Sequence, residues 1–290
     1  MRFAKGHGTG NDFIVVPDLD DRLDLRAEAV QALCDRHRGI GADGVLRIVR
    51  RESGAAPWFM DYRNADGSVA EMCGNGIRVV ARYVLDRGLA AGPELRIGTR
   101  AGVRVVLAEA DGNLTVDMGP ATAGPAGWAV AGGRRFSGGA VSVGNPHLVC
   151  LTSEPLAGID LSVPPQVDQA AFPGGVNVEF VRVTGDHAIA IRVHERGSGE
   201  TLSCGTGAVA AAVAAAVAAG EWEPGQHGPG EPGWPTGRGG QWSVDVAGGR
   251  LAVTPSATAS LLTGPAVIVA EGETCASWLD DSLARASAVS

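Results

Sequence analysis

The sequence contains Cys73-Gly74-Asn75-Gly76 and, 131 residues later (204 − 73), Cys204-Gly205-Thr206-Gly207. A second motif repeats in the same order, because Gly10-Asn11-Asp12-Phe13 returns as Gly144-Asn145-Pro146-His147 with an offset of 134 residues (145 − 11). One matching tetrapeptide is weak evidence, whereas two ordered pairs at nearly the same offset indicate an internal repeat. The sequence therefore predicts a tandem duplication with two similar halves.

Each half is expected to place strands before and after one helix. The run from Ile77 to Leu85 has helical spacing with its arginines on one side, and Asp86-Arg87-Gly88 is a typical helix end. The helix after Cys204 is almost all alanine and valine, so we expect strands to surround it on all sides. The expected strands, rich in β-branched residues or alternating in polarity, are 13–16, 45–49, 95–97, 103–107, 178–183, 188–193, 242–246 and 251–254.

The two halves are expected at residues 1–118 and 119–264. Residues 120–127 are interpreted as a connector, and the glycine- and proline-rich residues 220–241 as a surface loop. A last strand at 266–269, within 265–277, is expected to complete the first half, since duplicated folds often exchange terminal strands.

Composition favours a small molecule as the partner. The formal net charge is −8 and no run is rich in lysine or arginine, which argues against nucleic acid. The longest apolar stretch, Ala208 to Ala219, is shorter than the ~20 residues that span a bilayer, so no membrane partner is expected. The first residues lack the apolar segment of a secretion signal, which predicts a cytoplasmic location.

The residues available for cofactors are few. Lys5 is the only lysine, whereas pyridoxal phosphate enzymes hold their cofactor as a lysine Schiff base, and no G-x-G-x-x-G follows a strand pattern. The five cysteines form an odd set without a C-x-x-C pair, which argues against a disulfide framework and a zinc site. We therefore expect no cofactor, no metal and reduced thiols.

The repeated C-G-x-G motif has a chemical meaning at a helix start. Unpaired N–H groups and the helix dipole there stabilise a thiolate, which can lower a cysteine pKa from ~8.5 toward neutrality. The glycines let backbone N–H groups approach a carboxylate closely. Two such starts facing one carboxylate would place a base on one side of its α-carbon and an acid on the other, as inversion of that carbon requires. Cys73 and Cys204 are the expected pair.

Other readings of the cysteines remain open. Cys34, Cys150 and Cys275 are expected to be small core residues, which is the usual role of a free cysteine. Cys73 and Cys204 could also be core residues, or could belong to a thiol redox or binding protein.

The motifs closely resemble the diaminopimelate epimerase family, in family order over nearly the whole chain. Besides those quoted, they are Gly8-Thr9 before Gly10, Asn64-Ala65-Asp66-Gly67-Ser68, Glu71-Met72 before Cys73, Asn177-Val178, and Glu195-Arg196-Gly197-Ser198-Gly199-Glu200-Thr201. The resemblance implies an isomerase that interconverts LL- and meso-2,6-diaminopimelate on the way to lysine and peptidoglycan. It also implies an α/β (α+β) fold of two pseudo-symmetric halves. Each half would be a strand-rich, barrel-like sheet around a central helix, with the site in the cleft between the halves, and we expect a homodimer.

The resemblance assigns roles residue by residue. Cys73 and Cys204 would be the two bases, and Gly74, Asn75, Gly205 and Thr206 would offer backbone N–H groups to the reacting carboxylate. Glu195 would hold an ammonium group and, with His147, tune the cysteine pKa values. The residues that would bind the amino and carboxyl groups, largely at the distal end, are Asn11, Asn64, Asn145, Asn177 and Arg196.

The nearest alternative is a proline- or hydroxyproline-type racemase, which shares the two-cysteine logic. Those relatives typically carry His where Asn75 stands and lack the Glu195-Arg196 pair. Another alternative is an isomerase of the same fold without the cysteines. The sequence departs from the family pattern at Gly44, where many relatives carry Gln, and in the long loop that begins at Gly220.

Overall fold

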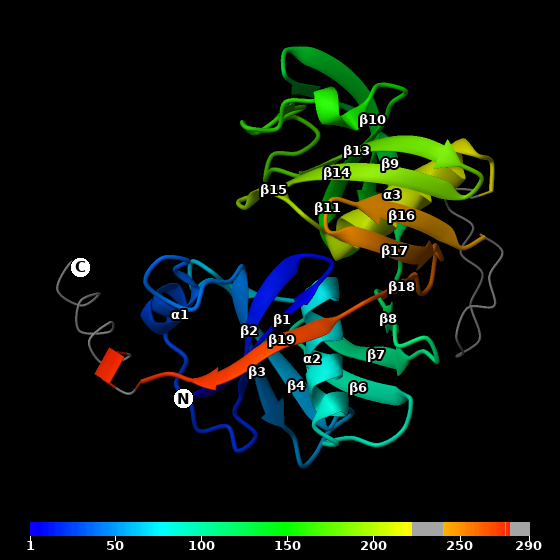
Figure 1. Ribbon diagram of the computed structural model, residues 1–290. Coiled ribbons are helices and arrows are strands. Elements are labelled where there is room, and N and C mark those ends of the chain that lie inside the picture. Colours follow the sequence, from blue (N-terminus) through cyan, green and yellow to red (C-terminus); the bar gives the residue numbers. More distant parts are fainter. Residues whose placement is uncertain (222–239, 276, 279–290) are drawn as a thin grey trace. The chain divides into compact units, whose positions relative to one another are not determined.

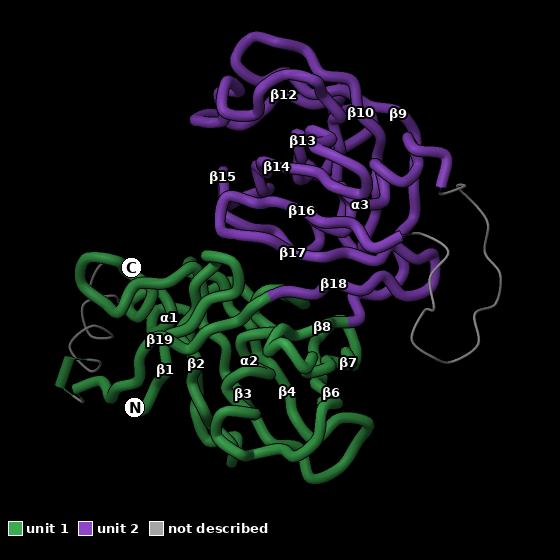
Figure 2. Tube along the Cα trace, turned by 45° about the vertical axis from the view of Figure 1, so that its right-hand side comes forward, with its two compact units in different colours: residues 1–116, 265–290 green, residues 117–264 purple. Residues whose placement is uncertain are grey.

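A computed structural model describes residues 1–221, 240–275 and 277–278 of the chain. Its described residues divide into two compact units, shown in different colours in Figure 2. Unit 1 comprises residues 1–116 with the C-terminal residues from 265, and unit 2 comprises residues 117–264. The predicted surface loop at 220–241 falls mainly on residues 222–239, which lie outside the described residues.

Unit 1 consists of a sheet with two helices (Figure 1). Neighbouring strands run in the order β19–β1–β2–β3–β4–β6–β7–β8, with β5 beside β4. The pairs β2–β3 and β4–β6 are parallel and the other pairs are antiparallel. The elements are β1 (Arg2–Gly8), β2 (Asn11–Pro17), α1 (Ala27–Cys34), β3 (Gly44–Arg50), β4 (Trp58–Asn64), β5 (Val69–Ala70), α2 (Gly74–Asp86), β6 (Glu94–Thr99), β7 (Gly102–Ala108), β8 (Leu114–Asp117) and β19 (Val267–Glu273).

Unit 2 repeats this arrangement. Its strands pair in the order β12–β9–β10–β11–β13–β14–β16–β17–β18, with β15 beside β14, and β11–β13 and β14–β16 are the parallel pairs. The elements are β9 (Thr122–Ala131), β10 (Arg134–Ser142), β11 (Pro146–Leu151), the 3₁₀ turn η1 (Leu156–Gly158), β12 (Gln166–Val167), β13 (Asn177–Gly185), β14 (Ala188–Glu195), β15 (Gly199–Thr201), α3 (Gly205–Ala218), β16 (Trp242–Val246), β17 (Gly249–Thr254) and β18 (Leu261–Gly264).

The shared pattern of parallel and antiparallel neighbours makes the two units pseudo-symmetric. In this pattern β2 corresponds to β11, β3 to β13, β4 to β14 and α2 to α3. The strand β19, from the end of the chain, takes in unit 1 the place that β9 takes in unit 2. The fold is therefore mixed α+β, strand-rich and built from two related halves.

Each unit wraps strands around one helix. Strands β10, β11, β13, β14, β16, β17 and β18 pack around α3, which confirms the expectation drawn from its alanine and valine composition. Strands β1–β4 and β19 pack against α2. The arginine-bearing side of α2 is not a solvent-facing side, because Arg78 is completely buried. An apolar pattern in sequence cannot reveal a charged side chain that the fold encloses.

The expectation that residues 120–127 form a connector was wrong. From Thr122 onward these residues belong to β9 and pair with β10. The glycines of this strand allow close packing. A Cβ atom at Gly127 would lie 3.1 Å from Leu148 Cδ1 and 3.3 Å from Phe172 Cε2. Small residues are needed there because neighbouring side chains cover the strand.

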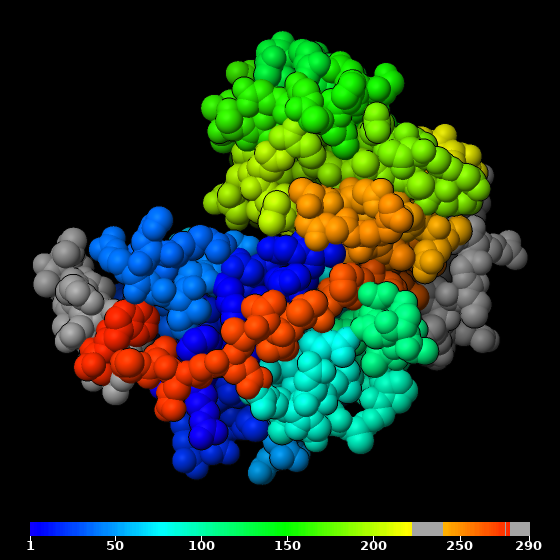
Figure 3. Space-filling view, viewed as in Figure 1, coloured from blue at the N-terminus to red at the C-terminus, as the bar shows by residue number. Residues whose placement is uncertain are grey.

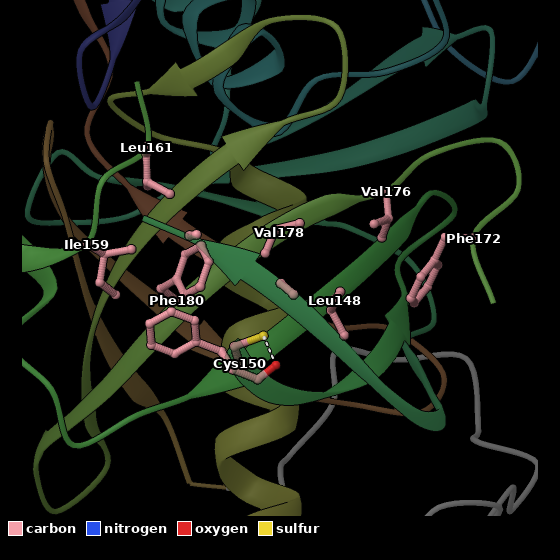
Figure 4. Packing of buried hydrophobic residues seen from close by; sticks show 11 residues of the cluster. Leu148, Cys150, Ile159, Leu161, Phe172, Val176, Val178 and Phe180 are labelled. Atoms are coloured by element: carbon pink, nitrogen blue, oxygen red, sulfur yellow. Dashed lines mark hydrogen bonds between the residues drawn. The ribbon is translucent and has the colours of Figure 1, made fainter. Parts of the chain in front are cut away.

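The face of the β9–β10–β11–β13 layer that is turned away from α3 carries a hydrophobic core of its own. Phe136 and Phe180 meet edge to face, with ring centroids 4.9 Å apart, and Leu148 and Phe172 lie in the same cluster (Figure 4). Cys150 is buried in this cluster with its thiol directed at the Phe136 carbonyl. The layer is thus buried on both faces, with this apolar cluster on one side and α3 on the other.

In the part of the chain that the structure describes, no helix combines the length and apolar character needed to cross a bilayer.

Candidate active site

Cys73 caps the start of α2 through its sulfur. The backbone N–H of Gly76 donates to Cys73 Sγ at 3.3 Å. Cys73 itself has extended backbone and directly precedes the first helical residue, Gly74. Asn11 Oδ1 lies 3.8 Å from this sulfur and accepts a hydrogen bond of 3.2 Å from Asn75 Nδ2. Unit 1 therefore brings together Cys73, Gly74, Asn75 and Asn11, four of the residues expected at the site.

The Asn11 amide is held from behind by Asp43. Asn11 Nδ2 donates to Asp43 Oδ2 at 2.7 Å, which fixes the amide so that its oxygen faces the cysteine. Asp43 in turn accepts from the Arg36 guanidinium at 2.8 Å. Sequence reasoning did not single out Asp43, although it stands directly before Gly44, where the sequence departs from the family pattern.

Cys204 caps α3 in the same way as Cys73 caps α2. The backbone N–H of Gly207 donates to Cys204 Sγ at 3.4 Å, and Thr206 Oγ1 lies 3.5 Å from the same sulfur. Asn145 Nδ2 donates to Thr206 Oγ1 at 3.3 Å. Unit 2 therefore gathers Cys204, Gly205, Thr206 and Asn145 at one helix start.

Carboxyl groups surround Cys204. Glu179 and His147 are completely buried, and their side chains meet at 2.7 Å. The other ring nitrogen of His147 lies 3.0 Å from Asn145 Oδ1. Glu195 accepts hydrogen bonds from the Thr201 hydroxyl and the Cys204 thiol. Glu195 therefore contacts this cysteine, whereas His147 contacts Glu179, a further group that sequence reasoning missed. The expected influence of His147 on the cysteine pKa values stays a prediction.

The pKa of Cys204 is raised well above the usual value for a thiol, which corrects the expectation of a lowered value. Burial is the largest cause, and the nearby carboxylates of Glu195 and Glu179 act in the same direction. The hydrogen bonds from Thr206 and Gly207 oppose the shift but are weaker. Burial also raises the pKa of Glu195. A helix start alone therefore does not decide the charge of a buried thiol.

The remaining expected residues lie at the edges of these groups. Asn177 donates to the Pro146 carbonyl at 3.4 Å and accepts from the Arg196 backbone N–H at 2.9 Å. The Arg196 guanidinium donates to the Gly174 carbonyl at 2.9 Å. Asn64 lies at the end of β4, where it donates to Ser68 Oγ at 3.0 Å and stands opposite Gly44 in the sheet. No hydrogen bond described for Asn64 connects it to Asn11 or Cys73.

Gly44, where many family members carry glutamine, sits against backbone. A Cβ atom on Gly44 would lie 2.5 Å from the Arg63 carbonyl oxygen and 2.8 Å from Tyr62 Cε2. A side chain at this position therefore requires a shifted strand.

Of the other cysteines, Cys34 and Cys150 are buried and burial raises the pKa of each to about 12, as expected of core thiols. Cys275 is exposed, so its assignment to the core was wrong. Among the described residues, no three His, Cys, Asp or Glu side chains gather in a way that could hold a metal ion.

Two buried charged groups had faint signals in the sequence. Arg78 is the charged residue between Ile77 and Val79, five positions after Cys73. Glu179 interrupts the apolar strand Val178–Val181. From the sequence, Arg78 and Glu179 could each be taken for a solvent-facing residue of an amphipathic element. Only the structure shows that both side chains are buried.

The diaminopimelate epimerase family model matches residues 3–123 and 139–269. The diaminopimelate epimerase of Thermobifida fusca is 50% identical over 286 residues, covering 94% of this chain and 97% of that protein. The diaminopimelate epimerase of Mycolicibacterium smegmatis is 48% identical over 301 residues, covering 96% of this chain and 98% of that protein.

Solved structures share the fold at low identity. A hydroxyproline epimerase from Agrobacterium vitis has a TM-score of 0.64 with 16% identity, covering 94% of this chain and 91% of that chain. A phenazine biosynthesis protein of Bacillus anthracis has a TM-score of 0.62 with 16% identity, covering 95% and 99%. These likenesses support the two-unit fold, and the family follows from the sequence matches: this chain belongs to the diaminopimelate epimerase family.

Proposed function

We propose that the protein is an isomerase that interconverts LL-2,6-diaminopimelate and meso-2,6-diaminopimelate by proton transfer between two cysteines and one α-carbon. The reaction serves the synthesis of lysine and of peptidoglycan precursors. The observation that carries the proposal is the pair of cysteine-capped helices, because Cys73 and Cys204 each accept an N–H at the start of their helix.

In the proposed mechanism one cysteine is a thiolate and the other a thiol. The thiolate removes the α-proton, and the electron pair of the broken C–H bond delocalises into the adjacent carboxylate. The thiol then delivers its proton to the opposite face of the carbon, and the two cysteines have exchanged protonation states. Backbone N–H groups of Gly74, Asn75, Gly205 and Thr206 would stabilise the charge that develops on the carboxylate.

The rest of the proposed site recognises a second amino-acid centre. Diaminopimelate carries an ammonium and a carboxylate at each end, and only one of its two α-carbons changes configuration. Arg196 suits the distal carboxylate, because a guanidinium can bind it bidentately. Glu195 suits an ammonium group. Neutral amides that can donate and accept would complete the binding of a zwitterion, and these are Asn11, Asn64, Asn145 and Asn177.

A proline- or hydroxyproline-type racemase is the second candidate, supported by the structural likeness. Proline has no distal ammonium or carboxylate, so Glu195 and Arg196 would have no substrate group to bind. Asn75 in place of the histidine typical of that group also favours diaminopimelate.

The deciding experiment incubates the pure protein with LL-diaminopimelate, and separately with L-proline, in D₂O. We expect meso-diaminopimelate labelled at one α-carbon and no change in proline. Cys73→Ser and Cys204→Ser should each reduce epimerisation about 10³-fold or more, because general acid–base groups contribute factors of this size. Retained deuterium exchange at the α-carbon in both variants would count against the two-base mechanism.

We also propose that the protein acts in the cytoplasm, since both reacting cysteines must stay reduced and all five cysteines are free thiols in the structure. Mild oxidation should abolish activity, and a reducing agent should restore it.

A homodimer is proposed as the working form. Val267 and Val269 of β19 are 43% and 55% exposed, and β19 is uncovered on one face of unit 1 (Figure 3). Light scattering coupled to size exclusion should give twice the chain mass, and Val269→Glu should shift the protein toward monomer. A wild-type protein of single-chain mass would refute this proposal.

A further inference from the structure

Arg78 is a completely buried cation inside α2. Its guanidinium donates to Asn75 Oδ1 at 3.0 Å, to the Gly74 carbonyl at 3.1 Å and to Thr9 Oγ1 at 3.4 Å. These partners are neutral, and no acidic side chain of the described residues lies within ion-pair distance of Arg78. Burial lowers the pKa of Arg78 to about 10, and the charge of Cys73 opposes this shift.

No acidic side chain of β1, β2, β3 or β4 faces α2. Cβ atoms at Gly6 and Gly8 would contact Val79 and Arg78, so these positions of β1 face the helix. The register then places Asn11 and Phe13 of β2 on the same face. It also places Leu46 and Ile48 of β3, and Tyr62 and Met60 of β4, on that face.

The acidic residues of these strands occupy the opposite face and pair there with basic residues, whereas Arg2 and Arg50, at strand ends, share the α2 face but are exposed. Lys5 binds Asp12 at 2.6 Å, and Arg47 binds Asp18 at 2.6 Å. Other charges near the helix ends are at the surface. Glu71, two residues before Cys73, is exposed, and Glu271 pairs with Arg87 at the far end of α2. Cys73 is therefore the acidic group best placed to balance the buried charge of Arg78.

Unit 2 lacks the buried arginine and instead carries a buried carboxyl group beside its helix start. The residue five positions after Cys204 is Val209 (204 + 5), so the arginine has no counterpart. Glu179 takes the position of Leu46, since a Cβ atom on Gly207 would meet Glu179 Oε1 at 2.7 Å and one on Gly76 would meet Leu46 Cδ2 at 3.0 Å.

The register places two further ionisable groups on the α3 face. His147 corresponds to Phe13, and Glu195, one position beyond the Val178–His194 pair, corresponds to Asn64. His147 and Glu179 are hydrogen-bonded to each other, and Glu195 adds a second carboxyl group. Other charged residues of these strands lie on the opposite face, among them Arg182, Arg192, His194, Asp245 and Arg250.

We propose that Arg78 is a positioning residue for the catalytic proton: its buried charge makes Cys73 the thiolate of the free protein, while Cys204 keeps its proton. The proposal rests on the proposed two-base function. Turnover from this form moves a proton from the substrate to Cys73 and another from Cys204 to the opposite face of the carbon. Product release leaves the less stable form, with the charge on Cys204, which returns by proton exchange with solvent.

The test measures alkylation of the substrate-free protein by iodoacetamide as a function of pH, with each cysteine followed by peptide mass spectrometry. Only thiolates react, so the pH midpoint at each site reports its thiolate fraction. In the wild-type protein the Cys73 midpoint should lie below the Cys204 midpoint. The reverse order would overturn the proposal, whatever the variants do.

Arg78→Met should raise the Cys73 midpoint by about 1–3 pH units, as expected for loss of a neighbouring charge, and leave Cys204 unchanged. Arg78→Lys keeps the charge and should stay nearer to wild type, which a purely structural role would not predict. Arg82→Met, which removes a partly exposed arginine one turn further along α2, is the matched control and should change neither midpoint. An unchanged Cys73 midpoint in folded Arg78→Met would also overturn the proposal.

The alkylation test needs no turnover, so it is independent of the substrate. A protein with the expected midpoints that fails to epimerise diaminopimelate would refute the proposed function and leave the charge assignment standing. In an active protein, the acid limb of the kcat/KM profile should move upward in Arg78→Met and return toward wild type in Arg78→Lys.

Discussion

Cys73 and Cys204 cap their helices alike, with sulfur to N–H distances of 3.3 and 3.4 Å, yet they stand in opposite electrostatic surroundings. A buried guanidinium lies near the first, and buried carboxyl groups lie near the second. Because a low-dielectric interior screens charges weakly, these few residues outweigh the similar helix starts. A duplicated motif can thus provide two chemically unequal thiols.

At the residue scale, Glu195→Gln should lower the pKa of Cys204, since the Glu195 carboxylate is one of the charges that raise it. We expect the pH midpoint of Cys204 alkylation in the substrate-free protein to fall by about one unit, with Cys73 unchanged. Glu200→Gln is the matched control, because Glu200 pairs with Arg192 near the surface. A fall of equal size in the control would show a general effect of charge.

At the scale of the elements, the two helix starts tolerate an added methyl group differently. A Cβ atom on Gly207 would lie 2.7 Å from Glu179 Oε1, whereas one on Gly76 would meet the end of the Leu46 side chain at 3.0 Å. Leu46 can move, but Glu179 is held by His147 in a buried pair. Glycine is therefore required more strictly at position 207 in α3 than at position 76 in α2.

Gly207→Ala should accordingly reduce kcat/KM at least about tenfold, since displaced catalytic neighbours lose their geometry. Gly76→Ala should remain within a few-fold of wild type and keep its melting temperature. Steady-state kinetics and thermal unfolding of the two variants, measured side by side, check the prediction. Equal losses in both would indicate that Glu179 is not the limiting neighbour.

The charged cluster behind Asn11 ties β1, β2 and the segment before β3 together. Burial by itself raises the pKa of Asp12, but hydrogen bonds and charges from Arg36 and Lys5 outweigh it and lower the pKa below its usual value. A carboxyl group whose pKa is depressed by folding stabilises the protein above its unfolded-state pKa of about 3.9. That stability is lost as the pH falls through the folded-state value.

Asp12→Asn should therefore lower the free energy of unfolding by about 1–3 kcal/mol at pH 7, the size of a charged hydrogen bond. The difference from wild type should shrink as the pH falls below about 4. Urea unfolding at pH 7 and at pH 3 measures it. A difference that stays constant with pH would mean that packing, rather than charge, is lost.

For the whole molecule, the final strand belongs to the first unit. β19 pairs with β1 in antiparallel register and packs on α2, so removing it exposes both. Unit 2 is one continuous segment of the sequence, and none of its strand pairs involves β19. The stability of unit 1 therefore depends on the last described residues of the chain.

A chain that ends at residue 264 should lose unit 1 as a folded body, because the edge strand that pairs with β1 and covers α2 is missing. We expect aggregation or a melting temperature lowered by more than about 10 °C. A chain that ends at residue 278 retains β19 and Trp278, whose indole N–H bonds the Arg38 carbonyl. This control should melt like the full chain, and equal behaviour of both truncations would contradict the assignment.

The sequence by itself determined the duplication, the two cysteine-capped helices, the enclosed α3 and the family. These features depend on local pattern: glycines after a cysteine start a helix, and an all-apolar helix must be covered. Most of the residues proposed for the site followed from the family motifs, and the structure brings Asn11 to Cys73 and Asn145 with Thr206 to Cys204, each within its own unit.

Tertiary structure alone decided which charges are enclosed and where the second unit begins its sheet. Arg78 and Glu179 look like ordinary polar positions in their segments, and residues 122–127 look like a connector. Burial and register arise from contacts between residues far apart in sequence, and periodicity within one segment does not encode them. For this reason the positions of the two cysteines could be derived from sequence, whereas their unequal surroundings required the fold.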